Sequence, residues 1–173
     1  MSGVRAFTEL HCWQRARIWS KDIFRETRES AFRQDVRLVT QINDSSESVM
    51  SNIAEGFGRG TQAEFILFLG YAIGSLDETK SHLCAAYDRE YLAKPRFGEL
   101  FREGTEIRKL TVALIRSMIL PRGGVKTLGK RTSWSNEVWE IYERLVGKPR
   151  PEKFGGPSEN GEAPAGEPDD EPS

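Results

Sequence analysis

Hydrophobic residues recur every three or four positions along four long stretches of the chain, which is the spacing of amphipathic α-helices. The pattern predicts helices over residues 8–29, 33–57, 61–90 and 94–120. Short connections between helices force neighbours to run antiparallel. We therefore predict an all-α fold, an antiparallel up-down-up-down four-helix bundle over residues 7–120.

The expected core is read from the same spacing. In the first stretch it comprises Leu10, Trp13, Ala16, Ile23 and Phe24, with Trp19 and Ile18 widening the stripe. In the third stretch it comprises Phe65, Phe68, Leu69, Ala72, Leu76, Thr79, Leu83, Ala86 and Tyr87. Small residues crowd the second stretch, and Gly70 and Gly74 lie one turn apart in the third, which indicates close packing against neighbours.

Local signals place the helix ends. Thr8 is a potential N-cap, and Thr61 with Glu64 has the spacing of a capping box. Three glycines, Gly56, Gly58 and Gly60, are expected to end the second helix, because glycine accepts the left-handed conformation that closes helices.

The chain changes character after Pro121. Residues 121–150 form a basic connector with 7 Lys/Arg against 3 Asp/Glu, and residues 134–146 have the pattern of a short helix. Residues 151–173 carry 1 against 7 and are rich in Pro and Gly, so we expect an acidic disordered tail. Residues 1–120 are nearly balanced, at 17 against 16. This asymmetry favours a charged partner.

The composition argues against several chemistries. The two cysteines, Cys12 and Cys84, cannot build a disulfide framework. His11 with Cys12, and His82 with Cys84, are too closely spaced to share one helix face, so no metal site and no cofactor are expected. No nucleophile has a recognisable base beside it, and we expect no catalytic residue. No signal peptide or membrane span is apparent, which favours a cytoplasmic protein.

Two sequence blocks resemble a known family. The first is Ser48, Ser51-Asn52-Ile53-Ala54-Glu55-Gly56 and Arg59, and the second is Glu64-Phe65, Phe68-Leu69, Ala72, Gly74-Ser75-Leu76 and Glu78. Together with Phe7, Leu10, Trp13-Gln14 and Ala16, they resemble the four-helix-bundle family of 23S rRNA intervening-sequence proteins over residues 7–120.

The resemblance implies a bundle that assembles as a homopentamer, without established catalytic residues. A related branch is the accessory variability protein of diversity-generating retroelements, which is a basic pentameric barrel that binds RNA, DNA and the reverse transcriptase. Asn43-Asp44 stand where the family commonly has two basic residues.

Two basic segments are candidate nucleic-acid contacts. Arg17, Lys21, Arg25 and Arg28 step by four, four and three along one helix face. An acidic stripe of Asp22, Glu26 and Glu29 runs beside them, so an ordinary solvated face remains the alternative. The second segment consists of Arg122, Lys126, Lys130 and Arg131, with Trp134 close behind; charge and stacking there suit a single strand, and a soluble linker is the alternative.

Arg59 is a further candidate contact in the family block. Within the same block, Asn52, Glu55 and Gly56 are interpreted as a structural motif that bonds and permits the turn into the third helix, with a polar site near the assembly axis as the alternative.

The sequence thus favours a non-enzymatic, oligomeric bundle that acts as an RNA-associated scaffold or accessory protein, with RNA, DNA or a reverse transcriptase as partners. The alternative is a protein–protein interaction module without nucleic-acid binding.

Overall fold

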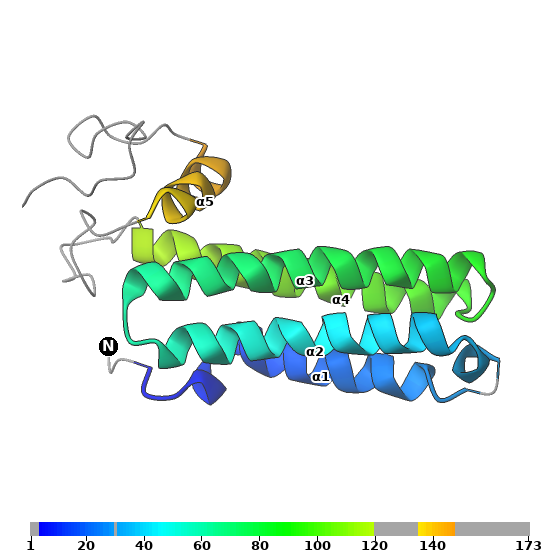
Figure 1. Cartoon of the computed structure of the whole chain (residues 1–173). Coiled ribbons are helices and arrows are strands. Elements are labelled where there is room, and N and C mark those ends of the chain that lie inside the picture. Colours follow the sequence, from blue (N-terminus) through cyan, green and yellow to red (C-terminus); the bar gives the residue numbers. More distant parts are fainter. Residues whose placement is uncertain (1–3, 30, 120–134, 148–173) are drawn as a thin grey trace, which may run out of the picture.

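The computed structural model describes residues 4–29, 31–119 and 135–147. Its elements are η1 (Phe7–Glu9), α1 (His11–Glu26), η2 (Phe32–Gln34), α2 (Val36–Gly58), α3 (Gln62–Asp88), α4 (Lys94–Ile119) and α5 (Asn136–Val146). The first four α-helices run up and down as one elongated bundle, with α1 and α2 in one layer and α3 and α4 in the other (Figure 1). The predicted all-α bundle is confirmed.

The start of α1 differs from the prediction. Residues Phe7–Glu9 form a separate 3-10 turn, and the N-cap of α1 is Leu10, whose side chain makes no capping hydrogen bond. Thr8 therefore caps nothing here; its carbonyl instead accepts a hydrogen bond from Gln14 Nε2 at 2.8 Å. At the other end α1 stops at Glu26, because the chain turns at Thr27, whose hydroxyl donates to the carbonyl of Phe24.

Polar side chains cap the N-termini of α2 and α3. Asp35 caps α2 by accepting the backbone N–H of Leu38 at 3.2 Å. Thr61 caps α3 by accepting the N–H of Glu64, and its own hydroxyl donates to the Glu64 carboxylate at 2.7 Å. Gly60 makes the turn between these helices with a φ of 79°.

The buried core follows the predicted periodicity, with shifts at its edges. In α3 the buried positions include Ile66 and Ile73, which the expected core omitted, whereas Tyr87 is 36% exposed. In α1 the structure buries Ala16 and Ile23 as expected. Of the two residues expected to widen the stripe, Trp19 is buried and Ile18 is 60% exposed, while the expected core residue Phe24 is 51% exposed. A helix with two neighbours buries a limited arc, and Ile18 and Phe24 fall outside it.

Small residues of α2 lie at the seam with α3. A β-carbon built on Gly56 would lie 2.5 Å from Cβ of Phe68, so Gly56 serves this close approach inside α2 rather than the turn that follows. Along the same seam, the hydroxyls of Ser45 and Thr79 hydrogen-bond at 2.9 Å.

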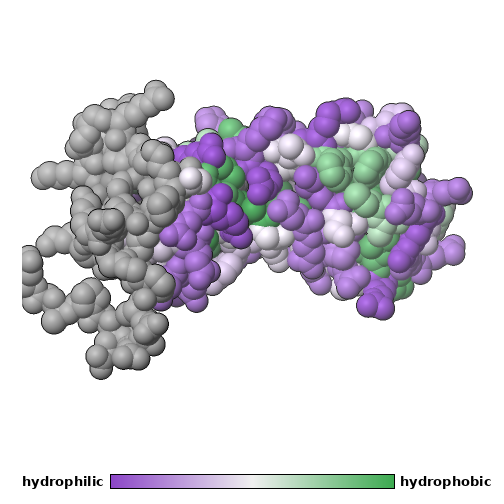
Figure 2. Space-filling model, turned by 90° about the horizontal axis from the view of Figure 1, so that it is seen from above, coloured by the Kyte–Doolittle hydropathy of each residue, from purple (hydrophilic) through white to green (hydrophobic). Residues whose placement is uncertain are grey.

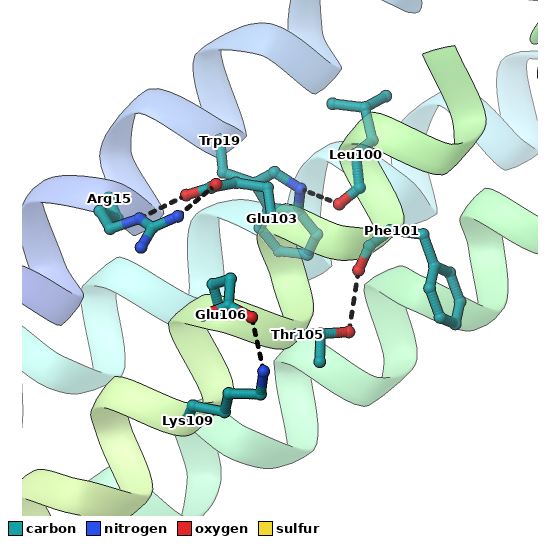
Figure 3. A network of polar contacts seen from close by, with 8 residues as sticks. All are labelled: Arg15, Trp19, Leu100, Phe101, Glu103, Thr105, Glu106 and Lys109. Carbon is teal, nitrogen blue, oxygen red and sulfur yellow. Dashed lines mark hydrogen bonds and ion pairs between the residues drawn. The ribbon is translucent and has the colours of Figure 1, made fainter. Parts of the chain in front are cut away.

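The pair α1 and α4 is joined by polar contacts (Figure 3). Trp19 is 1% exposed, and its indole N–H donates to the carbonyl of Leu100 at 2.9 Å. One turn away, Arg15 and Glu103 form a two-pronged ion pair with N–O distances of 2.7 and 2.5 Å.

The fifth helix corresponds to the short helix expected over 134–146. It lies on the α3–α4 side of the bundle, near the end where α2 turns into α3 (Figure 1). Seen from this side, the surface is mostly hydrophilic, with a hydrophobic area toward the end away from α5 (Figure 2). Within the described ranges, no helix has an apolar stretch that would cross a membrane.

Candidate nucleic-acid interface

The outer face of α1 carries the first predicted basic segment. Because Cys12, Ala16, Trp19 and Ile23 point into the core, helical spacing turns the positions between them outward. Arg17, Lys21 and Arg25 are all exposed there. Arg28 is also exposed, but it lies in the turn after the helix, where its N–H donates to the carbonyl of Arg25 at 3.2 Å. Arg17, Lys21 and Arg25 therefore share one side of α1, and Arg28 follows them in the turn.

Two of the three neighbouring acidic residues, Asp22 and Glu26, are half-buried, whereas Glu29 is exposed like the cations. Glu26 is half-buried toward α4, and its carboxylate accepts a hydrogen bond from Arg96 Nε at 2.7 Å. Asp22 is also half-buried and pairs with Arg25 at 3.2 Å. The acidic stripe is thus partly neutralised at the α1–α4 seam, whereas the cations Arg17, Lys21 and Arg28 make no ion pair with another described residue.

Apolar side chains lie among these cations. Phe24 is 51% exposed, and the guanidinium of Arg28 lies 5.8 Å from its ring centroid. The Arg17 guanidinium lies 5.9 Å from the ring of Trp13, and Ile18 is 60% exposed. A guanidinium over an aromatic ring is held by the ring's electrostatic field, which limits its range of positions.

Arg59 lies apart from this face, at the turn between α2 and α3. Its Nη2 donates to Glu55 at 2.7 Å, its Nη1 lies 3.9 Å from Glu64, and its guanidinium sits 5.0 Å from the ring of Phe68. The Glu55 hydrogen bond raises the pKa of Arg59. Two carboxylates therefore offset its charge, and the structure does not bring Arg59 together with the α1 cations.

The family block around Asn52 connects helices and the turn. Glu55 bonds Arg59 in the turn, whereas Asn52 lies 3.5 Å from the hydroxyl of Ser75 on α3 and not at the turn. The second basic segment, Arg122, Lys126, Lys130 and Arg131, lies outside the described residues, as does the tail over 151–173.

The Asn43-Asp44 departure has a structural counterpart. Asn43 is half-buried between α1 and α2, where its Nδ2 donates to Thr27 Oγ1 at 3.1 Å and to the carbonyl of Val39 at 2.8 Å. Only Asp44 is exposed. Position 43 therefore carries a hydrogen bond that joins α2 to the turn after α1.

The soft side chains remain separate. Cys12 is 3% exposed, and its burial raises the pKa of its thiol, which keeps the thiol protonated and unreactive. His82 lies 3.7 Å from Glu78 on the same helix. Among the described residues, no three His, Cys, Asp or Glu side chains gather as a metal site.

Two contacts of this region were not foreseen from sequence. Arg96, which holds Glu26, and Glu103, which holds Arg15, both come from α4, 70 and 88 residues away. The alternation of charge along each helix was visible, but the pairing between helices depends on how they pack.

The similarity to known proteins covers the four-helix bundle. The sequence pattern of the family described as 23S rRNA-intervening sequence protein matches residues 8–113. The chain belongs to this family. A crystal structure of a protein with unknown function from the S23 ribosomal protein family of Bacteroides thetaiotaomicron VPI-5482 has the same fold, with a TM-score of 0.56 and 22% sequence identity. The alignment covers 61% of this chain and 98% of that one. No curated protein matches the chain.

Proposed function

We propose that this protein is a non-enzymatic, oligomeric four-helix bundle that acts as an RNA-associated scaffold or accessory protein. The observation that carries the proposal is the row of exposed cations along α1 and the turn that follows it, of which three make no ion pair with a described residue. Cations Arg17, Lys21 and Arg28 project outward, while Glu26 is held at the seam by Arg96. Arg25 adds to the positive face, although Asp22 offsets part of its charge.

The physical basis of binding would be release of counterions from the phosphate backbone. Each neutralised phosphate lowers the slope of log K against log salt concentration by about 0.7–0.9. Three or four cations on one subunit give a modest affinity on this scale. Assembly into a ring would repeat the same face several times, and linked weak sites bind far more tightly than each one alone.

Family membership supports the choice of RNA and of a homo-oligomer, with a homopentamer as the form expected from the resemblance. The related accessory proteins of diversity-generating retroelements extend the proposal to DNA and a reverse transcriptase as partners. Sedimentation velocity of the purified protein tests the subunit number.

A second candidate function is a protein-interaction module without nucleic-acid binding. It is favoured by exposed apolar side chains on α1 and at the start of α2. Ile18, Phe24 and Val36 are 60%, 51% and 70% exposed. Exposed apolar side chains that lie close together are typical of protein–protein contact surfaces.

The deciding experiment measures binding of a structured RNA by fluorescence anisotropy at low and near-physiological salt. The test variant reverses Arg17, Lys21 and Arg28 to Glu. The matched control reverses Lys94, Arg102 and Lys109, three exposed cations of α4, and so changes the net charge equally.

We expect salt-sensitive binding that the test variant loses and the control retains. Absence of RNA binding by the wild-type protein would favour the interaction module. Equal losses in both variants would show that net charge, rather than the α1 face, governs binding.

A further inference from the structure

Phe24 is an aromatic residue on the outer face of α1, and its side chain is 51% exposed. A single apolar side chain at the surface is ordinary, so its neighbours decide whether it has a role. Side chains three or four positions apart on a helix are adjacent. Lys21 precedes Phe24 by three positions, and Arg17 lies one further turn back. On the other side, Arg28 in the turn after α1 brings its guanidinium to 5.8 Å from the ring centroid. Phe24 therefore lies within a row of cations.

The three cations of this row are those whose charge is unpaired. Arg17, Lys21 and Arg28 make no ion pair with another described residue, whereas Arg25 pairs with Asp22 at 3.2 Å. Arg25 also lies to one side of the row, because residues adjacent in sequence point in different directions on a helix. Positive charge that is free to meet a phosphate therefore borders the Phe24 ring on both sides along α1.

Aromatic rings also limit how far the arginines of the row can move. The guanidinium of Arg17 lies 5.9 Å from the ring centroid of Trp13, much as that of Arg28 lies beside Phe24. A guanidinium that is attracted to the face of a ring keeps a restricted range of positions. The entropic cost of ordering these side chains on a ligand is reduced accordingly. The row is thus a partly preformed arrangement of charges around an exposed ring.

This combination fits an unpaired segment of RNA better than a duplex. In an A-form helix the bases stack on one another, and a protein mainly contacts the shape of the backbone with its phosphates and 2′-hydroxyls. A duplex would engage the cations and leave the Phe24 ring uncovered. An unpaired base also offers its flat face, and proteins that bind single strands combine a cationic track with aromatic rings on which bases stack.

We propose that Phe24 stacks on an unpaired base of RNA whose flanking phosphates contact Lys21 and Arg28, so that the α1 face selects single-stranded segments over continuous duplex. Arg17 neutralises a further phosphate of the same strand. This inference rests on the RNA contact proposed above and narrows its ligand to the unpaired regions of a structured RNA.

The experiment measures binding of three RNAs of equal length to the full-length protein by fluorescence anisotropy. They are an unstructured single strand of about ten nucleotides, the same strand annealed to its complement, and an abasic strand that retains the phosphates. Phe24→Leu removes the ring and keeps an apolar side chain, while Phe24→Tyr retains an aromatic ring. Tyr71→Leu is the matched control, because Tyr71 of α3 is 49% exposed and lies outside the α1 face.

We expect wild-type protein to bind the single strand more tightly than the duplex. Phe24→Leu should weaken binding of the single strand at least about fivefold, since stacking of one base on an aromatic ring contributes that much or more. The same variant should leave the affinities for the duplex and the abasic strand unchanged, whereas Phe24→Tyr and Tyr71→Leu should bind all three RNAs as wild type does. A loss that requires both the ring and the base assigns the effect to stacking.

The salt dependence of binding separates the ring from the cations. Lys21→Gln should reduce the slope of log K against log salt concentration by about 0.7 for the single strand, because one phosphate contact is lost. Phe24→Leu should lower the affinity at every salt concentration without changing this slope, since it removes no charge.

The outcomes distinguish this inference from the proposed function. If wild-type protein binds none of the three RNAs at low or near-physiological salt, both are wrong. If it binds RNA but Phe24→Leu weakens the single strand and the duplex alike, or weakens neither, the RNA contact stands and stacking by Phe24 is overturned. Circular dichroism verifies that each variant is folded, and Phe24→Met replaces Phe24→Leu if the latter is not.

Discussion

Gly104 of α4 faces the indole ring of Trp19 so closely that a β-carbon built on it would lie 2.7 Å from Cζ2 of the ring. The ring cannot easily retreat, because its N–H is bonded to the carbonyl of Leu100 and the side chain is 1% exposed. The glycine and the tryptophan together set the distance between α1 and α4.

Gly104→Ala should therefore destabilise the bundle. Overpacking a core costs about 1–3 kcal/mol, of which up to about 1 kcal/mol is returned by the better helix propensity of alanine. Urea unfolding followed by circular dichroism measures the net loss. Gly98→Ala on the same helix is the control, because its β-carbon would meet only the flexible end of Arg102, at 3.4 Å. Equal stability of the two variants would contradict this account.

The ion pair of Arg15 and Glu103 should contribute little to stability despite its two-pronged geometry. Their side chains are 39% and 33% exposed, so water and salt screen the interaction. A double-mutant cycle with Arg15→Gln and Glu103→Gln should give a coupling energy of about 1 kcal/mol or less, decreasing at high salt. A larger coupling that salt does not change would show that the pair is effectively buried.

The bundle could be predicted from sequence because its core repeats at helical spacing over more than 100 residues, and Ile42, Ile53 and Leu76, all completely buried, follow that spacing. The residues at the edges of the apolar stripe could not be assigned to the core or the surface in this way. Whether Phe24 lies inside or outside the core depends on the direction of α2 and α4 around α1, which spacing within α1 does not contain.

The candidate interface was only partly predictable for the same reason. The sequence places basic residues beside an acidic stripe, but the separation of the two depends on Arg96, which is 70 residues away from Glu26. Likewise, the amphipathic pattern of α5 predicts a helix, while the fit of Ile141 against Gly70 is a contact between distant segments that no local pattern records.

The role of Arg96 yields a functional prediction that follows from the proposed RNA contact. Arg96→Gln leaves the Glu26 carboxylate without its partner beside the positive face of α1, so RNA binding should weaken although Arg96 itself belongs to the seam. The interaction of a partly exposed charge with its neighbours contributes about 1 kcal/mol or less. The expected loss of RNA affinity is therefore about two- to fivefold at low salt.

Arg108→Gln is the comparison for this measurement. Arg108 of α4 pairs with Asp77 of α3 at 3.6 Å, so this ion pair does not involve α1. Fluorescence anisotropy with the same RNA should show the decrease for Arg96→Gln and a smaller one for Arg108→Gln. If the two variants lose affinity equally, neutralisation of Glu26 has no particular role.

Asp35 predicts a specific dependence of stability on pH. The hydrogen bond from the Leu38 N–H, together with the Arg89 side chain and the Tyr91 hydroxyl, lowers the pKa of this carboxyl. Since the pKa is lower in the folded state than in the unfolded chain, the ionised carboxylate stabilises the fold at neutral pH. That contribution is complete above the ordinary aspartate value of about 3.9 and is lost as the pH falls through the folded pKa.

Asp35→Asn keeps a side-chain oxygen for capping but removes the charge. The variant should be less stable than wild type at pH 7, and the difference should shrink as the pH is lowered below about 4, where the wild-type carboxyl itself becomes protonated. Urea unfolding at a series of pH values measures both curves, and Asp44→Asn, which removes an exposed carboxylate from the same helix, supplies the baseline. A difference between wild type and Asp35→Asn that stays constant down to pH values near 3 would mean that Asp35 acts through its shape as a cap and not through its charge.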